Sequence, residues 1–450
     1  MTAAAELPVN LKANPRLSRW LRFNRDGYVE LSPGKVELGQ GIVTALAQIA
    51  ADELDVRLER IRMVPVSTAA SPNEGTTSSS LSVEQSGSAV RHAAAQARAI
   101  YLAHAAQRLG VAPDSLSVDD GTIIGPGNLR TSYWELADDA LLARDATPGI
   151  APKAPAARRI AGTPSPRLDL PDKVFGRPRF IHQLDLAGML HGRVLRPDSP
   201  SSRLGALDDR AARAVAGVVA VVRDGSFVGV VAETEAAAEA GLAALRKGAT
   251  WTAGEPLPNE TDLTAWLKSQ PLETTTVGER KAAAPTPAAR TLRRQYSRPF
   301  IAHASMAPSC AIAQWTAPDE LKVWSHCQGV YGLRIDLSLA LGLPQEKITV
   351  AHVEGAGCYG HNGADDVAFD AALLARAAGG RPVRLQWSRA DELAWSPMGA
   401  AMAVEIEADL DQKGEIVGWR GQVWSNGHVS RAGRAPIPTV LAASHIAKPF

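Results

Sequence analysis

Cysteine is scarce in this chain: only Cys310, Cys327 and Cys358 occur among its 450 residues. They are far apart in the sequence, so they fit neither a disulfide framework nor a Cys-x-x-Cys metal motif. An iron–sulfur cluster usually needs four thiolates, which three cysteines cannot supply. Any transition metal in this protein is therefore expected to come inside a cofactor.

An excess of one charge sign and long apolar runs are also lacking. The chain has 48 Lys and Arg against 47 Asp and Glu, a net charge of +1, so there is no electrostatic case for nucleic acid or an anionic membrane. No run of 18 apolar residues occurs, and we expect no membrane span. Residues 1–21 lack the pattern of a signal peptide. We expect a cytoplasmic protein, with any membrane association made through partners.

What is present is the composition of a globular protein, with 45% hydrophobic and 21% charged residues. The length allows two or three domains with cores of their own. A stretch rich in proline and alanine predicts a linker at 146–168, and loose composition predicts a second linker region at 253–295. These divide the chain into a first block at 1–145, a compact unit at 169–252 and a second block at 296–450.

Helical and strand patterns both occur in the parts of the chain outside the linkers, and we expect an α+β fold. Ser88 is expected to be the N-cap of a long alanine-rich helix that Gly110 stops. Helices are expected at 41–54, 88–109, 233–247, 329–341 and 364–378. Strands are expected at 27–31, 217–222, 227–232, 311–315, 321–324, 347–354, 382–387 and 402–410.

Two glycine-dense turns, each opening a predicted helix, are the most informative segments. One is Glu-Leu-Gly-Gln-Gly at 37–41, and the other is Gly-Ala-Gly-Cys-Tyr-Gly-His-Asn-Gly at 355–363. Glycine lets the backbone reach positive φ and approach a bound group closely. A helix N-terminus offers free N–H groups and a positive dipole end to an anion. Together the turns predict a large, polar, phosphate-bearing cofactor held mostly by backbone.

Several motifs follow the order found in one known family. They are the two turns, Gly-Met-Leu-His-Gly-Arg-Val at 188–194, Trp-Ser-His-Cys-Gln-Gly at 324–329 and Arg-Pro-Val-Arg at 381–384. On these motifs the chain resembles the molybdopterin-binding large subunit of the xanthine dehydrogenase/aldehyde oxidase family. The nearest branch is that of nicotinate dehydrogenase and isoquinoline oxidoreductase type subunits. The resemblance implies permuted molybdopterin-binding α/β blocks, with an α/β hammerhead domain inserted between them at 169–252.

The resemblance implies a molybdenum hydroxylase, an oxidoreductase that hydroxylates an N-heteroaromatic or aldehyde substrate with oxygen from water. The expected cofactor is molybdopterin cytosine dinucleotide, with molybdenum held by the pterin dithiolene and by no protein ligand. Electrons are expected to pass to a small [2Fe-2S] partner subunit, and a cytochrome c is a further candidate partner. The part of the protein would be positioning and electrostatics, because the hard chemistry belongs to the cofactor.

The same resemblance assigns site residues. Gln328 matches a glutamine whose side-chain amide approaches an oxo ligand of molybdenum, and a primary amide can donate there without adding charge. It is the catalytic candidate. The cofactor-binding candidates come from a pterin-contacting turn, a hydroxyl-rich loop suited to a pyrophosphate and a turn facing the metal oxygens: Gly39, Gln40, Gly41, Gly75, Thr76, Thr77, Ser78, Ser79, Ser80, Gly357, Cys358, Tyr359 and Gly360.

Plainer interpretations of these residues stay open. Each turn could be an ordinary helix start, and the hydroxyl-rich loop could simply be flexible. His326, His352 and His361 lack helical i, i+4 spacing, so we expect packed or hydrogen-bonded histidines rather than a metal triad. Cys358 is expected to fill space rather than to react. A non-catalytic relative that binds a nucleotide or partner is the main alternative. A nicotinamide enzyme is disfavoured because no Gly-x-Gly-x-x-Gly follows a strand.

One element of the family pattern is missing. The family's general base is a glutamate in a Gly-x-Gly-Glu turn, and this sequence contains no such turn. General acid–base assistance contributes about 10²–10⁴-fold to a reaction, so its source matters. We expect the glutamate, with part of the substrate pocket, on a C-terminal large-subunit segment, carried either by a longer chain or by a partner chain.

Overall fold

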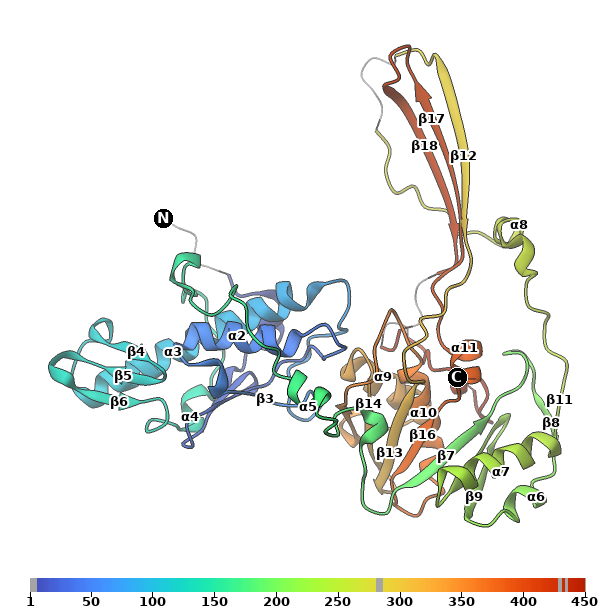
Figure 1. The fold of residues 1–450 in the computed structure, drawn as a ribbon, viewed down its shortest axis with the longest axis horizontal. Coiled ribbons are helices and arrows are strands. Elements are labelled where there is room, and N and C mark those ends of the chain that lie inside the picture. The colour runs from blue at the N-terminus through green and yellow to red at the C-terminus, as the bar shows by residue number, and fades with distance from the viewer. Residues whose placement is uncertain (1–5, 281–285, 428–430, 434–435, 450) are drawn as a thin grey trace.

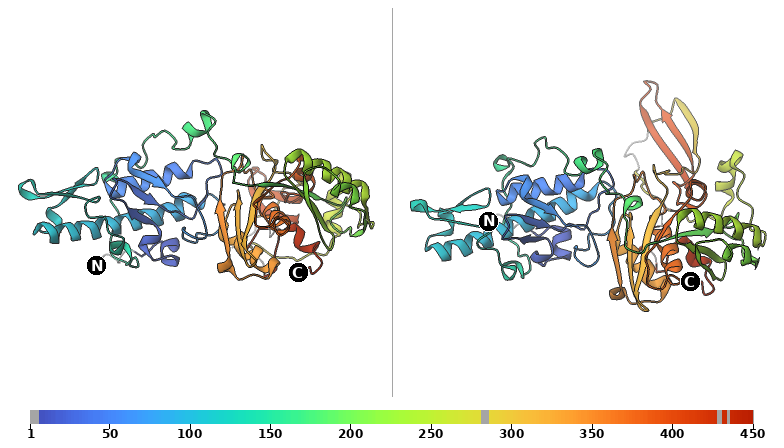
Figure 2. Two further views of the ribbon diagram at one scale, coloured as in Figure 1. Left: turned by 90° about the horizontal axis from the view of Figure 1, so that it is seen from below. Right: turned by 60° about the horizontal axis from the view of Figure 1, so that its bottom comes forward.

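The computed structural model describes residues 6–280, 286–427, 431–433 and 436–449. Two bodies lie side by side, joined by a segment that contains α5 (Leu170–Val174), and a long sheet projects from the second body (Figures 1 and 2). Helices occur with both parallel and antiparallel strands, which confirms the α+β class. Among the described residues, no helix is long and apolar enough to cross a membrane.

The first body is built around two packed helices and a small sheet. In α2 (Ile42–Leu54) apolar residues recur at helical spacing, and this face packs against α3 (Ser88–Leu109). Its core holds fully buried Trp20, Leu46 and Tyr133. The other elements of this body are α1 (Val9–Ala13), α4 (Asp139–Leu142), a sheet of β1 (Leu21–Phe23), β2 (Val29–Leu31) and β3 (Ile61–Met63), and a sheet of β4 (Ser117–Asp119), β5 (Thr122–Ile124) and β6 (Arg130–Ser132).

The predicted linker at 146–168 lies along this first body. The backbone N–H of Lys153 donates to the buried Glu53 carboxylate at 3.0 Å, and that of Arg159 donates to Asp52 at 2.8 Å. Both acceptors belong to α2. The segment is therefore tied by its backbone to the helix that begins at the Gly-Gln-Gly turn.

The second body is centred on a seven-stranded mixed sheet with the order β15-β14-β13-β16-β7-β10-β9. α10 (Ala364–Ala375) packs on its middle strands and α7 (Glu235–Gly248) on β7 and β10, while β11 (Ala249–Trp251) pairs with β8 (Leu204–Leu207) beside it. The sheet strands are β7 (Leu190–Leu195), β9 (Val218–Asp224), β10 (Phe227–Ala232), β13 (Cys310–Ala317), β14 (Glu320–Ser325), β15 (Ile348–His352) and β16 (Val383–Gln386). The remaining helices are α6 (Arg210–Arg213), α9 (Val330–Leu341) and α11 (Arg389–Trp395).

This sheet draws on both of the later sequence parts. Strands β7, β9 and β10 come from the compact unit predicted at 169–252, and β13 to β16 come from the block predicted at 296–450. The two parts meet where β7 pairs in parallel with β16. One hydrophobic cluster contains residues of both parts, and a second cluster, around Val228, Val230 and Leu245, belongs to the 169–252 part alone. The hammerhead boundaries remain a prediction.

A three-stranded antiparallel sheet projects away from the second body (Figure 1). It consists of β12 (Arg290–Arg298), β17 (Met402–Leu410) and β18 (Ile416–Ser425), with α8 (Leu263–Ser269) at its base. Tyr296, Val404 and Val423 lie in one cross-strand row, and Trp419 lies on the same face. Tyr296, Trp419 and Val423 are each more than half exposed. One apolar face of this sheet is thus open to solvent.

Most of the predicted elements are present, but the cap at Ser88 is wrong. A wide helical turn at Ser82–Gly87 runs directly into α3, so Ser88 lies inside a continuous helix and its hydroxyl donates to the Glu84 carbonyl. The earlier start has a packing reason. Ser86 donates to the buried Glu74 carboxylate at 2.7 Å, and Gly87 leaves room for Ile49 of α2.

We predict that Gly192→Val destabilises the junction between β7 and β16. A Cβ at Gly192 would lie 2.6 Å from the Leu374 Cδ1 of α10 and 3.1 Å from a Val383 methyl group. Overpacking of this kind costs about 1–3 kcal/mol, which thermal unfolding will show as a lower midpoint. Gly278→Val is the control, because a Cβ there meets nothing within 4 Å. Equal midpoints for the two variants would contradict the prediction.

Candidate functional site

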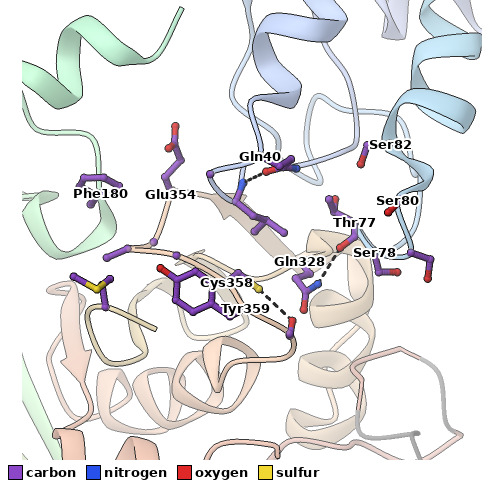
Figure 3. A pocket seen from close by; sticks show the side chains of 18 of the residues that line it. Gln40, Thr77, Ser78, Ser80, Ser82, Phe180, Gln328, Glu354, Cys358 and Tyr359 are labelled. Carbon is purple, nitrogen blue, oxygen red and sulfur yellow. Dashed lines mark hydrogen bonds between the residues drawn. The ribbon is translucent and has the colours of Figure 1, made fainter. Parts of the chain in front are cut away.

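A cleft of about 830 Å³ lies where the two bodies meet (Figure 3). Turns from the first body form one wall, and turns at the ends of β14 and β15 form the other. The lining residues are Leu38, Gly39, Gln40, Thr77, Ser78, Ser79, Ser80, Ser82, Lys173, Phe180, Met306, Gln328, Glu354, Gly355, Ala356, Gly357, Cys358, Tyr359, Gly360 and Arg431. Of the predicted site residues, only Gly41, Gly75 and Thr76 are outside this lining.

The turn at 39–41 reaches its shape through glycine and through Glu37. Gly39 and Gly41 have φ of 106° and 82°, which L-residues other than glycine rarely adopt. Their N–H groups donate to the Glu37 carboxylate at 2.9 and 2.8 Å, and the Val43 N–H donates to it at 3.1 Å. The expectation that the N-terminus of α2 offers free N–H groups to a cofactor anion is therefore wrong, because a carboxylate of the chain already occupies that position.

Gln40 folds back onto its own turn. Its amide nitrogen donates to the Val36 carbonyl at 2.9 Å. Its amide oxygen accepts from the Leu38 N–H at 2.6 Å (Figure 3). Gly39 and Gln40 line the cleft, whereas Gly41 lies behind it against the Arg167 guanidinium. The turn is thus braced by its own side chains.

The hydroxyl-rich loop at 75–80 carries backbone strain. Ser79 and Ser80 have φ of 57° and 58° in succession, and such conformations cost about 1–3 kcal/mol each and cluster at ligand clamps. Thr77 and the three serines line the cleft. Gly75 and Thr76 lie behind it, and the Thr76 carbonyl accepts from the Lys35 ammonium at 3.0 Å. The loop therefore presents hydroxyl groups to the cleft from a constrained backbone.

Gln328 spans the two walls. Its amide nitrogen donates to the Thr77 carbonyl at 2.9 Å, and the Thr77 N–H donates back to the Gln328 carbonyl at 2.7 Å. Its amide oxygen accepts from the Arg431 guanidinium at 2.6 Å. An amide nitrogen has two hydrogens, and the contact with the opposite wall uses one of them.

The turn at 355–360 belongs to the second wall, and all its residues line the cleft. Gly357 has a φ of 100°, and a Cβ there would lie 2.5 Å from the Tyr359 hydroxyl. The Cys358 thiol donates to the Gly360 carbonyl at 3.2 Å, and burial raises the pKa of this thiol. A protonated, hydrogen-bonded thiol supports a space-filling role for Cys358.

The three histidines are hydrogen-bonded, as expected. His352 contacts the carbonyl oxygens of Cys327 and Glu37 at 3.1 and 3.0 Å, so it links both walls from behind. His326 accepts from the Cys310 N–H at 3.2 Å, and His361 lies 3.3 Å from the Asp365 carboxylate. Within the described part of the chain, no group of three His, Cys, Asp or Glu side chains is placed to hold a metal ion.

Sequence reasoning missed several cleft residues, above all Lys173, Glu354 and Phe180. Lys173 and Phe180 belong to the segment that crosses from one body to the other, and Glu354 follows β15. No periodic pattern marks them. A lysine and a glutamate far apart in sequence carry no local signal of pairing. They could be identified only once it was known where the chain passes from one body to the other.

The lining fits a bulky ligand that bears phosphate groups. The cleft has the size of a cofactor pocket, with hydroxyl groups on one wall and Gly355, Gly357 and Gly360 on the other. Glu354 is its only carboxylate among the described residues, and it is neutralised by Lys173 at 2.8 Å and Arg179 at 2.7 Å. An anionic group in the cleft would therefore meet donors rather than an unpaired negative charge.

Comparison with known proteins decides the family. Two models of a molybdopterin cofactor-binding domain match the chain, one at 4–157 and the other at 267–450. The chain belongs to the xanthine dehydrogenase family of molybdopterin-binding subunits. The first match contains the Gly-Gln-Gly turn and the hydroxyl-rich loop, and the second contains Gln328 and the 355–363 turn.

Two curated relatives match most of this chain, and one solved structure is similar to part of it. The chain is 38% identical to a nicotinate dehydrogenase subunit from Pseudomonas putida over 90% of its length, and it covers 34% of that protein. It is 27% identical to an isoquinoline 1-oxidoreductase subunit from Brevundimonas diminuta over 88% of its length, covering 57% of that protein. The structure of quinoline 2-oxidoreductase from Pseudomonas putida 86 matches with a TM-score of 0.47 at 22% identity, over 58% of this chain and 39% of that one.

We predict that His352 makes stability fall with decreasing pH. Burial lowers its pKa from 6.5 to about 4, although its two carbonyl partners favour the charged ring. Above pH 6.5 the ring is neutral in both states and carries no penalty. Below it the unfolded chain takes up the proton first, so stability is lost progressively down to pH 4, by up to about 3 kcal/mol.

The measurement compares thermal midpoints between pH 7.5 and pH 4.5. The midpoint of the parent should fall more steeply than that of His352→Gln, which has no titrating ring at this position. His104→Gln, at a partly exposed site in α3, should follow the parent. Parallel curves for the parent and His352→Gln would show that His352 does not contribute.

Proposed function

We propose that this chain forms the cofactor-binding part of a molybdenum hydroxylase large subunit that holds molybdopterin cytosine dinucleotide in the cleft between the two bodies. The observation that carries the proposal is that the candidate residues lie together. Residues matched to the family at 39–40, 77–80, 328 and 357–360 come from four separate turns, yet they line one cleft. The permuted block order with a hammerhead unit at 169–252 belongs to the same proposal.

When bound, the cofactor would supply the oxidative hydroxylation of a carbon in an N-heteroaromatic or aldehyde substrate, with electrons leaving to a second subunit. The chain would supply positioning. The hydroxyl groups of Ser78, Ser79 and Ser80 suit the phosphates of the dinucleotide, and the turns at 39–40 and 357–360 would flank the pterin and the metal oxygens. The side chain of Gln328 would direct its second amide hydrogen toward a ligand oxygen, while Thr77 and Arg431 fix the amide plane.

The relatives suggest what the whole enzyme would contain in addition to this chain. The chain spans 34% and 57% of the lengths of the two relatives above, and relatives named as subunits imply further chains. We propose a small [2Fe-2S] partner, because the described cysteines Cys310, Cys327 and Cys358 are not grouped. A further large-subunit segment with the catalytic glutamate, and a cytochrome c, complete the proposed set.

The test is metal and pterin content. The chain should be purified with its co-expressed partners from a host that makes the cofactor, and molybdenum and the nucleotide released by acid should be quantified per chain. About one molybdenum and one cytosine nucleotide per chain are expected. A bound nucleotide without molybdenum or pterin would favour the non-catalytic relative and overturn the proposal.

In the assembled enzyme we predict that Gln328→Ala lowers turnover by about 10²-fold, the loss typical of one preorganised donor. Cofactor loading should survive, because the backbone turns hold most of the ligand. Turnover must be expressed per molybdenum atom on the same sample, with Gln345→Ala at an exposed site as the control. Unchanged turnover would remove Gln328 from the site, and an equal loss of molybdenum would make it a retention residue.

A further inference from the structure

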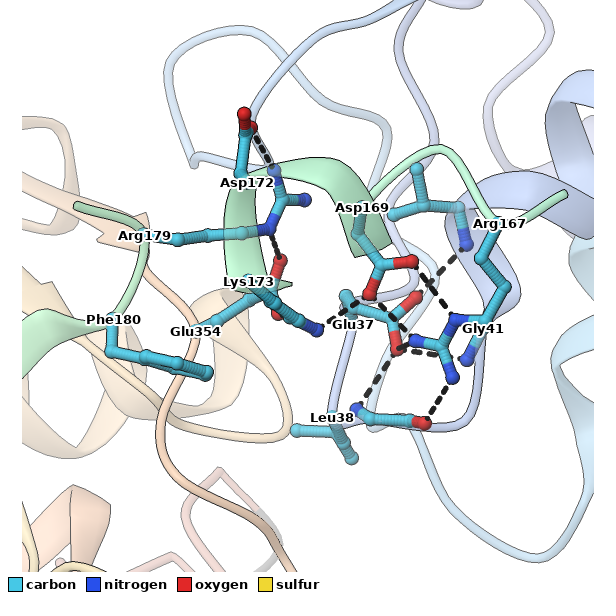
Figure 4. Close-up of polar contacts among 12 residues, drawn as sticks. Glu37, Leu38, Gly41, Arg167, Asp169, Asp172, Lys173, Arg179, Phe180 and Glu354 are labelled. Carbon is cyan, nitrogen blue, oxygen red and sulfur yellow. Dashed lines mark hydrogen bonds and ion pairs between the residues drawn. The ribbon is translucent and has the colours of Figure 1, made fainter. Parts of the chain in front are cut away.

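The segment at 167–180, which we term the connecting segment, crosses from the first body to the second beside the cleft (Figure 4). It contains the short helix α5 and an unusual density of charge: Arg167, Asp169, Asp172, Lys173, Arg177 and Arg179. Lys173 and Phe180 also line the cleft. A chain that only linked two bodies would need neither buried charges nor contacts with both walls.

On the side of the first body, the connecting segment holds the Gly-Gln-Gly turn. Arg167 donates to the Gly39 carbonyl at 2.9 Å and lies 3.6 Å from the Glu37 carboxylate that braces this turn. The same guanidinium makes a two-point contact with Asp169, at 2.9 and 2.6 Å. Two-point arginine–carboxylate pairs are geometrically specific, so the position of Asp169 is coupled to the turn at 39–41.

On the side of the second body, the connecting segment holds the start of the 355–360 turn. Lys173 lies 2.5 Å from Asp169 and 2.8 Å from Glu354, so one ammonium joins carboxylates of the segment and of the second body. Arg179 donates to the other oxygen of Glu354 at 2.7 Å. The Glu354 carbonyl accepts from the Ile181 N–H at 2.8 Å, which fixes the segment along this wall.

These groups form a chain of alternating charge in the order Glu37, Arg167, Asp169, Lys173, Glu354, Arg179 and Asp172. Asp169 is fully buried, and Glu354 is 8% exposed. Burial raises the pKa of the Asp169 carboxyl, but hydrogen bonds from Arg167 and Lys173 outweigh it and hold that pKa well below its usual range. Removing Lys173 would leave the buried carboxylates Asp169 and Glu354 with one cationic partner each, Arg167 and Arg179, and a buried charge that loses part of its compensation is costly.

Lys173 is the midpoint of this chain. We propose that Lys173, through Asp169 and Glu354, acts as an electrostatic clamp that sets the spacing of the two cleft walls and thereby places the cofactor-binding turns relative to each other. Lys173 is a positioning residue in this proposal, since its ammonium is occupied by two carboxylates. That the turns bind a cofactor is taken from the proposed function, but the clamp itself concerns only the spacing of the walls.

Backbone amides that cross between the bodies give a direct readout. The Thr77 N–H donates to the Gln328 carbonyl, the Thr68 N–H to the Val350 carbonyl, and the His352 N–H to the Val66 carbonyl. None of these residues belongs to the connecting segment. Their hydrogen-exchange rates report whether the bodies stay closed, whereas amides within α3 and β10 report the stability of each body.

In Lys173→Met, measured without cofactor, exchange at the amides of Thr68, Thr77 and His352 should accelerate by about tenfold or more while α3 and β10 keep parental rates. Lys173→Arg should restore most of the protection, because it retains the charge. Arg177→Met is the matched control. Arg177 lies in the same segment, and among the described residues it forms an ion pair only with Asp172, the last member of the charge series, at 3.2 Å. In this control variant the amides of Thr68, Thr77 and His352 should exchange at parental rates.

Glu354→Gln removes the same contact from the second body with almost no change in side-chain volume. It should accelerate exchange at the same three amides, and it serves as the test if Lys173→Met does not fold. Parental exchange at the three crossing amides in Glu354→Gln would overturn the clamp, as would equal acceleration in Arg177→Met. In cofactor-loaded samples, molybdenum per chain should fall in Lys173→Met and not in Arg177→Met. If the parent binds no molybdenum, the proposed function fails, and the exchange result still decides the clamp.

Discussion

The structure depends on the contact between two bodies that each have a core of their own. Thr77 and Gln328 exchange two hydrogen bonds across this contact, and Thr68 and His352 extend it along β15. No single block of the sequence contains the cleft, because each wall is the surface of a different body. The relative position of the two bodies therefore brings the glycine-rich and serine-rich turns together as one candidate site.

Charge is used in an unusual way at this contact. The cleft exposes few ionised groups, and those that line it are paired: Glu354 with Lys173 and Arg179, and the Gln328 amide with Arg431. Glu37 occupies the N-terminus of α2 and satisfies three backbone N–H groups there. The turn is thus hydrogen-bonded within the chain itself, and the phosphates of the proposed ligand would meet hydroxyl and amide donors instead of a helix dipole. Preorganisation of this kind lowers the ordering cost of binding.

Backbone conformation adds a second constraint. Gly39, Gly41 and Gly357 hold positive φ values, and Ser79 and Ser80 hold them without the freedom of glycine. Such strain persists only when the surroundings determine it. Here the surroundings include two hydrogen bonds that Thr77 accepts, from the Gln328 amide at 2.9 Å and from the Val36 N–H at 3.0 Å. The same residues that hold the bodies together therefore also shape the loop that faces the cleft.

By itself, the sequence determined the local elements and the family. Apolar spacing predicted α2, α9 and β17 nearly to the residue, because a helix or strand with one buried face carries its period in the sequence. Motifs such as Gly-Gln-Gly predicted the cleft residues that come from glycine and hydroxyl turns. Elements of three residues such as β4, β5 and β6 gave no such signal, since they are too short to show a period.

Only the tertiary structure decided how these pieces act together. It showed that Glu37 takes the helix N-terminus expected to face an anion, that Ser88 lies within a helix, and that β7 and β16 bring two sequence parts into one sheet. It also brought Lys173 to Glu354, 181 positions away in sequence, at 2.8 Å. The physical reason is the same in each case. Pairing and burial depend on which surfaces meet, and side chains far apart in sequence carry no local record of that meeting.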